Sequence, residues 1–244
     1  MSTREQIKYR FLYFLNAYPA IYMPVARVRY RRATDLLVTP DTELVIEAFS
    51  RAGTTFANFA FLSAQTRPVK TVHHTHASAQ VITAVRMGKP TLVIVRPPVD
   101  AVLSHMARFR VSPRAALVAW IRFHERILPY LDRIVLTSFE AMTKDFGAVI
   151  RRINEKFATE FGIWQHTKEN EAQVFEQIRQ RNRSRFGDGP SAARFRALAI
   201  PTPEREALKE KLQAQLQAES LAPIRQKAQH LYARIMSGIP CNAE

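Results

Sequence analysis

Two short segments of the sequence carry residues whose types and order could do chemistry. The first, Phe49–Phe56, reads F-S-R-A-G-T-T-F and joins a β-rich run to a helical one. Gly53 allows a ligand to approach the backbone closely, and Thr54 and Thr55 add hydroxyl donors at a helix N-terminus, where backbone N–H groups attract anions. Arg51 adds a positively charged guanidinium group, whose paired N–H donors can bind an anion. The segment predicts an anion-binding loop, although an ordinary helix start capped by a threonine has the same residue types.

This loop lacks two features of the ATP-binding Walker A sequence. The leading glycine is absent, and so is the lysine that reaches the terminal phosphates of ATP. Nucleotide hydrolysis is therefore disfavoured, and a P-loop kinase-like enzyme is kept only as an alternative.

The second segment, Arg96–Ser104, reads R-P-P-V-D-A-V-L-S. It follows the continuous β-branched run Thr91–Val95, which is typical of a strand buried on both faces, and its prolines open a helix. Arg96 therefore follows the end of the strand, and Ser104 lies about two turns into the helix that Asp100 begins.

Three histidines follow another β-rich run. His73, His74 and His76 surround Thr75 at its end, and an imidazole with a pKa of about 6.5 can accept a proton at neutral pH. If the strand continues, alternation places His74 and His76 on the same side, so either is a candidate base. A metal site is the rival interpretation, but no carboxylate lies nearby in the sequence. The single cysteine, Cys241, excludes a Cys-based zinc site and an internal disulfide.

In this order, the segments resemble the motifs of the sulfotransferases that use 3′-phosphoadenosine 5′-phosphosulfate (PAPS). The family's phosphosulfate loop is commonly Y-P-K-S-G-T-T-W, and its second motif is often R-N-P-x-D-x-x-x-S. Its cytosolic branch has K-T-H between them, with the histidine as catalytic base, where this chain has His74–His76. Ser138–Met142 resembles the family's Y-E-D-L segment. The resemblance covers roughly residues 43–161 and fades at both ends.

The resemblance implies a role for each matching residue. His76 is the expected base, with His73 and His74 as competitors for the role. Arg51 replaces the family's lysine beside the bridging oxygen. Arg96 and Ser104 are expected to hold the 3′-phosphate. No metal is required. The cofactor-binding residues implied by the resemblance are Arg51, Ala52, Gly53, Thr54, Thr55, Phe56, Arg96, Ser104 and Arg185.

Two of these assignments have alternatives. Phe56 matches a family tryptophan that packs on adenine, but it could equally be a helix residue facing the core. Arg185 with Gly187 loosely matches a late R-K-G segment that reaches the 3′-phosphate. It belongs to a basic cluster that could instead be a solvated helix face or a groove for an anionic acceptor: Arg179, Arg181, Arg183, Arg185, Arg194 and Arg196.

The hydrophobic pattern predicts the elements that position these residues. From Glu43 onward, short β-rich runs alternate with longer helical ones, which indicates an α/β fold with a parallel sheet flanked by helices and a helical C-terminal appendage. The resemblance makes this a P-loop sulfotransferase-like fold. Strands are expected at 43–49, 69–73, 91–95 and 133–137, and helices at 54–64, 78–87, 98–109, 111–131, 145–157 and 203–236. We divide the chain into a basic aromatic segment (1–40), a PAPS-binding core (41–162) and a helical part that completes the same domain (163–244).

Composition limits the class of partner. The 244 residues include 36 Lys and Arg and 21 Asp and Glu, a net charge of +15, and 47% are hydrophobic, which excludes a largely disordered chain. Such a charge attracts anions. A non-enzymatic basic protein that binds nucleic acid or an anionic membrane is the second alternative, but the motifs favour an enzyme, and no nucleic acid is expected. The acceptor is expected to be a small molecule, lipid or carbohydrate.

The first residues combine positive charge with aromatic side chains. The run from Phe11 to Ala26 is shorter than the ~20 residues of a membrane span and contains Asn16, Pro19 and Pro24. Its aromatic face is expected to pack on the main domain, with peripheral membrane contact through residues 1–32 as the alternative. A cytoplasmic protein is expected, with membrane association as the alternative, because the single cysteine fits a reducing compartment.

Overall fold

The computed structural model describes residues 3–31, 36–187 and 203–238. The strands are β1 (Leu44–Ala48), β2 (Thr71–His73), β3 (Thr91–Val95) and β4 (Val135–Ser138). The α-helices are α1 (Thr3–Leu15), α2 (Pro19–Arg29), α3 (Thr54–Ser63), α4 (Ser78–Arg86), α5 (Pro98–Phe109), α6 (Pro113–Ile127), α7 (Phe139–Lys144), α8 (Phe146–Phe157), α9 (Lys168–Phe186), α11 (Pro203–Leu216) and α12 (Ala222–Met236). Two short 3₁₀ helices are η2 (Leu128–Arg133) and η3 (Glu219–Leu221).

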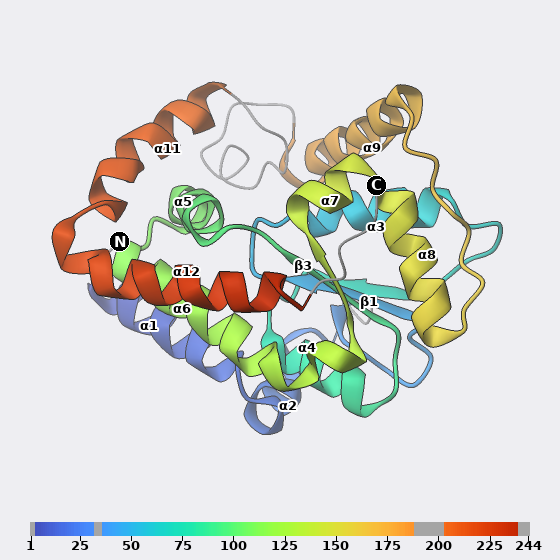
Figure 1. Ribbon diagram of the computed structural model, residues 1–244, viewed down its shortest axis with the longest axis horizontal. Helices are drawn as coiled ribbons and strands as arrows, with labels where there is room; N and C mark the ends of the chain where they lie inside the picture. Colours follow the sequence, from blue (N-terminus) through green and yellow to red (C-terminus); the bar gives the residue numbers. More distant parts are fainter. Residues whose placement is uncertain (1–2, 32–35, 188–202, 239–244) are drawn as a thin grey trace.

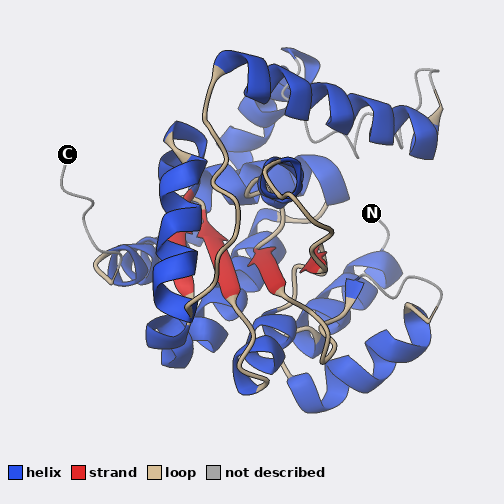
Figure 2. Cartoon of the chain, turned by 90° about the vertical axis from the view of Figure 1, so that its right-hand side faces the viewer, coloured by secondary structure: helices blue, strands red, loops and turns tan. Residues whose placement is uncertain are grey.

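Within these residues, the four strands form one parallel sheet in the order β2-β1-β3-β4. Helices cover both faces of the sheet (Figures 1 and 2), which confirms the predicted fold class. The chain passes from β1 to β2 on one side and then crosses to β3 on the other side of β1. Ligands of open parallel sheets bind beyond the carboxyl ends of the strands at such a reversal. The two phosphate motifs follow β1 and β3, so both begin at this point.

Alternate residues of the central strands face opposite layers of the core. Ile46 and Ile94 lie in the cluster built with α3, α8 and α9, while Val93 and Val95 lie in the cluster built with α4, α5 and α6. This alternation follows from the two-residue repeat of a strand and explains why each run is apolar throughout. Both layers therefore hold the strand ends rigidly.

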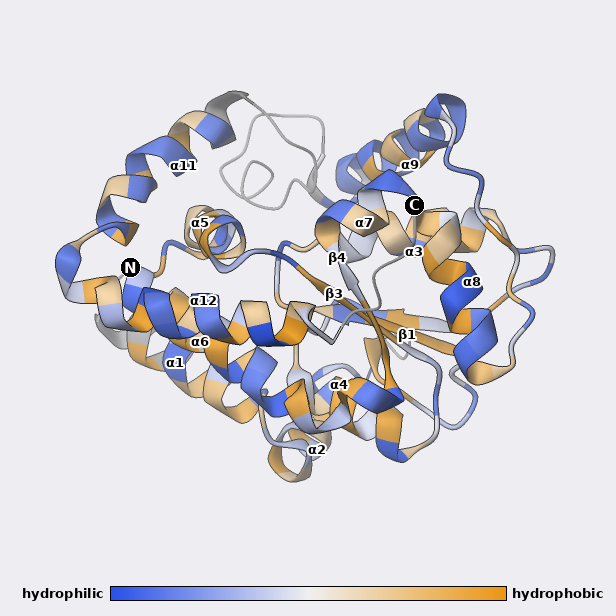
Figure 3. Ribbon diagram, viewed as in Figure 1, coloured by the Kyte–Doolittle hydropathy of each residue, from blue (hydrophilic) through white to orange (hydrophobic). Residues whose placement is uncertain are grey.

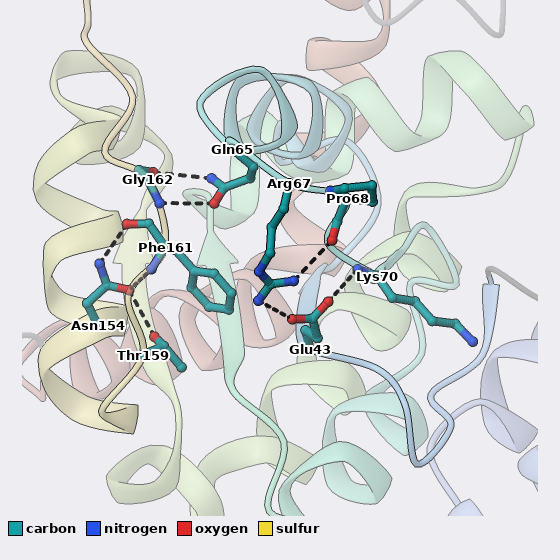
Figure 4. A network of polar contacts seen from close by, with 9 residues as sticks. All are labelled: Glu43, Gln65, Arg67, Pro68, Lys70, Asn154, Thr159, Phe161 and Gly162. Atoms are coloured by element: carbon teal, nitrogen blue, oxygen red, sulfur yellow. Dashed lines mark hydrogen bonds and ion pairs between the residues drawn. The ribbon is translucent and has the colours of Figure 1, made fainter.

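Polar side chains fasten the loops at the other end of this layer (Figure 4). Gln65, just after α3, donates to the Gly162 carbonyl and accepts from the Gly162 N–H. Any side chain at position 162 would overlap the carbonyl oxygen of Ala64, so only glycine allows this approach. Nearby, Glu43 accepts from Arg67 and from the Lys70 backbone N–H. The Gln65 contacts fix the end of α3 against the chain that leads into α9, and those of Glu43 join the residue before β1 to the segment before β2.

The C-terminal helices differ from the prediction. The expected continuous helix 203–236 is wrong, because α11 ends at Leu216 and α12 begins at Ala222 after the 3₁₀ turn η3. Pro223 explains the break: it lacks an N–H donor and clashes with the preceding turn, so it is tolerated only in the first turn of a helix. The two resulting helices fold back on α5 and α6.

The N-terminal helices pack on the domain through part of their surface. Tyr9 is buried and its hydroxyl lies 2.5 Å from His105 Nε2, while Tyr22 and Met23 are buried between α2 and the sheet layer. None of the helices in the described residues is both long and apolar enough to span a membrane.

Candidate functional site

A cavity of about 390 Å³ lies beyond the carboxyl ends of β1, β2 and β3. Its walls come from the loops after these strands and from α3, α5, α7, α9 and α11. Among the described residues that line it, six side chains are cationic and two are carboxylates, so the cavity is strongly positive. The cations are Arg51, Arg96, Arg108, Arg181, Arg185 and Lys209, and the carboxylates are Glu171 and Glu206.

The loop after β1 presents backbone donors to this cavity. Gly53 is the N-cap of α3 with φ 86°, and no described side chain caps this helix. The alternative of an ordinary threonine-capped helix start is therefore wrong, and the first-turn N–H groups at Thr54 and Thr55 stay available to an anion. A Cβ on Gly53 would lie 2.7 Å from Met142 Cε and 3.1 Å from Phe139, so α7 closes tightly over the loop.

Arg51 connects the two phosphate motifs. Its Nε donates to Ser104 Oγ at 3.2 Å, and its carbonyl oxygen accepts from Arg96 Nη1 at 3.1 Å. Arg51 has φ 75°, in the left-handed region that non-glycine residues rarely adopt. The bond from Arg96 holds this conformation, so the structure brings together the three charged or polar side chains that the motifs single out.

Two residues of the cavity wall, Arg96 and Asn182, each have a buried donor atom without a partner among the described residues. Arg96 lies with its guanidinium carbon 4.6 Å from the centre of the Phe139 ring, and its Nε has no hydrogen-bond partner within the described chain. The same holds for Nδ2 of Asn182, a buried residue of α9. Buried polar groups are normally hydrogen-bonded, so these donors are suited to a polar ligand.

The histidine segment does not continue as a strand. β2 ends at His73, and His74 (φ 85°) and His76 (φ 53°) both adopt left-handed backbone conformations. The alternation argument for these two residues is therefore wrong, because it requires extended backbone. The turn nevertheless brings both imidazoles to the cavity wall, with ring centres 5.3 Å apart. Both remain candidates for the base.

Hydrogen bonding distinguishes the two imidazoles. His76 Nδ1 lies 3.0 Å from the carbonyl oxygen of Ala48, which can only accept, so Nδ1 carries the proton and Nε2 keeps its lone pair. His74 Nδ1 is buried with no partner in the described residues. Burial lowers the pKa of His76 to about 4, with smaller contributions from Arg108 and Arg51. His76 is therefore neutral at physiological pH, and its Nε2 can accept a hydrogen bond.

Glu47 positions this turn, and the sequence analysis missed it. Its carboxylate is fully buried and accepts from the Thr75 N–H (3.0 Å), the Thr75 hydroxyl (2.6 Å) and the His76 N–H (3.0 Å). Burial raises the pKa of Glu47 to about 7, against the opposing effect of these donors. The signal was present in the sequence: a single acid inside the apolar run L-V-I-E-A-F must find buried partners.

The arginine cluster divides between two faces of α9. Arg181 and Arg185 line the cavity, whereas Arg179 and Arg183 form ion pairs with Glu176 away from it. A helical period of 3.6 residues produces this division. The interpretation as a solvated helix face therefore holds for Arg179 and Arg183 but not for Arg181 and Arg185. Arg194 and Arg196 lie outside the described residues.

The remaining predicted residues differ in position. Phe56 packs on Trp164 and Phe175, with ring centres 5.7 Å and 5.6 Å away, as a helix residue facing the core does. It also lines the cavity, so packing on adenine stays a prediction. Ala52 is buried in the core cluster and does not line the cavity. Only its backbone could therefore contact a ligand bound in the cavity.

Within the described residues, no three His, Cys, Asp or Glu side chains are arranged to hold a metal ion.

Comparison with known proteins gives likeness in structure only. No protein-family model matches the chain, and no curated protein sequence matches it. Among the solved structures that match is the crystal structure of the mouse sulfotransferase SULT7A1 complexed with PAP. The two chains share 10% sequence identity with a TM-score of 0.42, over 79% of this chain and 90% of that one. The roles of individual residues therefore rest on the motifs and on the geometry of the cavity.

Proposed function

We propose that this protein is a sulfotransferase that moves a sulfuryl group from PAPS to a hydroxyl or amine acceptor, with His76 as general base. One observation carries the proposal. Two motifs that resemble those of PAPS-dependent sulfotransferases, separated by about 40 residues of sequence, converge on one positive cavity, where Arg51 bonds to both Arg96 and Ser104.

The cavity suits the size and charge of PAPS. Its volume of about 390 Å³ lies in the range of small-molecule sites, and its excess of cations matches a ligand with two phosphate groups and a sulfate. Arg96 and Asn182 each have a donor without a partner among the described residues, and both residues belong to the cavity wall. Phe56 offers an aromatic edge for the adenine.

Each step of sulfuryl transfer has a candidate residue. PAPS would supply the sulfuryl group, with adenosine 3′,5′-bisphosphate (PAP) as its leaving group. His76 Nε2 would accept the proton of the acceptor as the acceptor atom bonds to sulfur. Arg51 and the N-terminus of α3 would stabilise the negative charge that develops on the departing 5′-phosphate. Glu47 would keep the turn of His76 in place through its bonds to Thr75 and His76.

Calorimetric titration of PAP, adenosine 5′-phosphate and ATP at low and near-physiological salt tests the proposal. We expect PAP to bind more tightly than either competitor at both salt concentrations, because a site that holds the 3′-phosphate loses that contact with the other two ligands. Release of PAP from PAPS in the presence of screened acceptors would then establish the reaction.

The same titration distinguishes the alternatives. Preference for ATP, dependent on Mg²⁺, would support a kinase-like enzyme instead. Equal affinity for the three ligands would instead indicate non-specific binding to a basic surface, if that affinity also falls steeply as the salt concentration rises. Counterion release dominates binding of this kind.

A further inference from the structure

The two N-terminal helices carry most of the exposed apolar side chains of the described chain. Six of the eight large hydrophobic residues that are exposed there lie on α1 and α2, and the other two are Leu62 and Met87. Figure 3 shows hydrophobic stretches on both helices, which form the lower edge of the molecule in that view. We call these six residues the N-terminal patch: Ile7, Phe11, Phe14, Ile21, Val25 and Val28.

The patch has helical periodicity. On α1, Ile7, Phe11 and Phe14 recur at intervals of four and three residues, and the side chains of Ile7 and Phe11 are 63% and 60% exposed. On α2, Val25 and Val28 follow Ile21 with the same spacing. Residues at this spacing share one face of a helix, so each helix presents an apolar stripe to solvent.

Both helices are anchored, so the stripes are part of the folded surface. The opposite faces are buried through Tyr9 on α1 and through Tyr22 and Met23 on α2. The turn between them is tied to the domain, because the Asn16 carbonyl accepts from the Ala79 N–H at 2.9 Å and the Ala17 carbonyl accepts from Arg126 Nε at 3.0 Å. Phe14 also contacts Tyr18 and Arg122, whereas Ile7, Phe11 and Val28 are at least 60% exposed, so much of each stripe is not used in packing the domain.

Cations lie beside the apolar stripes. Arg10 follows Ile7 by three residues and Arg29 follows Val25 by four, so each lies on the edge of a stripe, and both are exposed. Arg27 and Arg31 are exposed next to them. Over residues 3–31 the sequence holds six Lys and Arg and one acid, Glu5. Each apolar stripe therefore has an exposed cation beside it, and we call these cations the positive rim.

The positive rim favours a bilayer over a second copy of the chain. In a symmetric dimer the same patch would meet itself, and the cations of both copies would face one another. An anionic lipid surface complements them, while the apolar side chains enter the headgroup boundary. Helices of 13 and 11 residues are too short to cross the hydrocarbon core, so they would lie along the surface.

We propose that the N-terminal patch on α1 and α2 docks the protein on anionic lipid bilayers, with both helices lying in the membrane interface. This inference is independent of the sulfotransferase proposal, because it uses no residue of the cavity.

Vesicle flotation tests the docking with the full chain. The vesicles consist of phosphatidylcholine alone or of an equimolar mixture with phosphatidylserine. A protein with a charge of +15 will adsorb to the anionic vesicles in any case, so the deciding variant leaves the charge unchanged. We expect the double substitution Phe11→Ser and Val25→Ser to weaken partitioning to the mixed vesicles by at least about tenfold, because both side chains leave the interface.

A matched control separates the patch from general hydrophobicity. Leu62→Ser with Met87→Ser removes two exposed apolar side chains outside the patch and should leave partitioning unchanged. A second variant, Arg10→Ala with Arg29→Ala, should reduce binding to the mixed vesicles only, and circular dichroism checks that each variant is folded.

Three results would overturn the docking proposal. The first is failure of the wild-type protein to float with the mixed vesicles. The second is equal partitioning of the Phe11 and Val25 variant and the wild type, which would leave electrostatic adsorption as the cause. The third is a wild-type protein that is a dimer in light scattering and does not bind vesicles, while the Phe11 and Val25 variant is a monomer. That result would mean that the patch contacts a second copy of the chain.

Discussion

Arg51 Nε donates a hydrogen bond of 3.2 Å to Ser104 Oγ, which joins the loop after β1 to the second turn of α5. The two residues are 53 positions apart in the chain, and Ser104 is buried. In the proposed complex Ser104 contacts the 3′-phosphate, while Arg51 acts at the 5′ side. Their contact therefore couples the two ends of the site, and the ligand would share the Ser104 hydroxyl with Arg51.

Substitution of Ser104 by alanine should reduce the preference for PAP over adenosine 5′-phosphate. A hydrogen bond to a charged group contributes about 1.5–3 kcal/mol, so we expect PAP to bind at least about tenfold more weakly, with little change for the monophosphate. Calorimetry measures both affinities. Ser63→Ala, at the exposed end of α3, is the matched control and should alter neither affinity. Equal losses for both ligands in Ser104→Ala would refute the assignment to the 3′-phosphate.

The two candidate bases should differ sharply in their effect on turnover. His76→Ala should lower turnover by about 10² or more while PAP still binds, because its Nε2 is the oriented proton acceptor. His74→Ala is the matched control on the same turn and should have a much smaller effect on turnover. Rates of PAP release from PAPS, with PAP affinity measured alongside, decide between them. A large loss of turnover in His74→Ala with a small one in His76→Ala would exchange their roles.

His76 should stay neutral at pH values well below the usual pKa range of an imidazole. Burial places its pKa at about 4 in the folded protein, against 6.5 for an unperturbed histidine. Since the unfolded chain binds more protons between these values, His76 contributes stability that is present above pH 6.5 and lost as the pH falls through 4. NMR titration of the imidazole carbon-bound protons, assigned with His76→Ala, measures the pKa directly. A midpoint near 6.5 would contradict the burial of this side chain.

Gly53 should be sensitive to a single added methyl group. In Gly53→Ala the new Cβ meets Met142 and Phe139, and the residue must keep a positive φ. Gly88→Ala provides the control, because Gly88 also has a positive φ (67°) but no atom lies within 4 Å of its Cβ position. Both variants should lower the melting temperature, whereas only Gly53→Ala should also weaken PAP binding. Unchanged PAP affinity in Gly53→Ala would show that the loop tolerates displacement.

The sequence was sufficient to predict an element's bounds where the local hydrophobic pattern determines them. Thr91–Val95 was predicted as a strand with the bounds that it has, because a continuous β-branched run is buried on both faces. The ends of weaker runs were displaced: β2 begins at Thr71 instead of Val69, and β4 begins at Val135 instead of Arg133. In both cases the first residue of the strand is decided by its pairing with a neighbouring strand, which lies far away in the sequence.

The sequence was insufficient where a distant partner determines conformation. The strand rule places His74 and His76 on one side, but Glu47, 28 and 29 residues earlier, binds Thr75 and the His76 N–H and turns the backbone. Similarly, the basic cluster could be divided only once α9 was known to pack on α3. The motifs thus predict which side chains share a site, and tertiary contacts decide how they are oriented.

Glu47 offers the sharpest test of this long-range control. Its pKa is about 7 in the folded protein and 4.5 in the reference state, so its contribution to stability is full below pH 4.5 and is lost as the pH rises through 7. Glu47→Gln removes this titration. It also places an amide against the donors of Thr75 or His76, which should cost about 1–3 kcal/mol. The variant should therefore be less stable than the wild type, and the difference should narrow as the pH rises from 4.5 to 7.

Melting temperatures of the two proteins across this pH range measure the effect. Glu43→Gln is the matched control at the start of the same strand. Hydrogen bonding to Arg67 lowers the pKa of Glu43, so the ionised form stabilises the fold and the control should not show this narrowing between pH 4.5 and 7. A constant difference between Glu47→Gln and the wild type would mean that Glu47 is ionised throughout. The turn of His76 would then be held by a buried carboxylate whose charge is stabilised by hydrogen-bond donors that include Thr75 and His76.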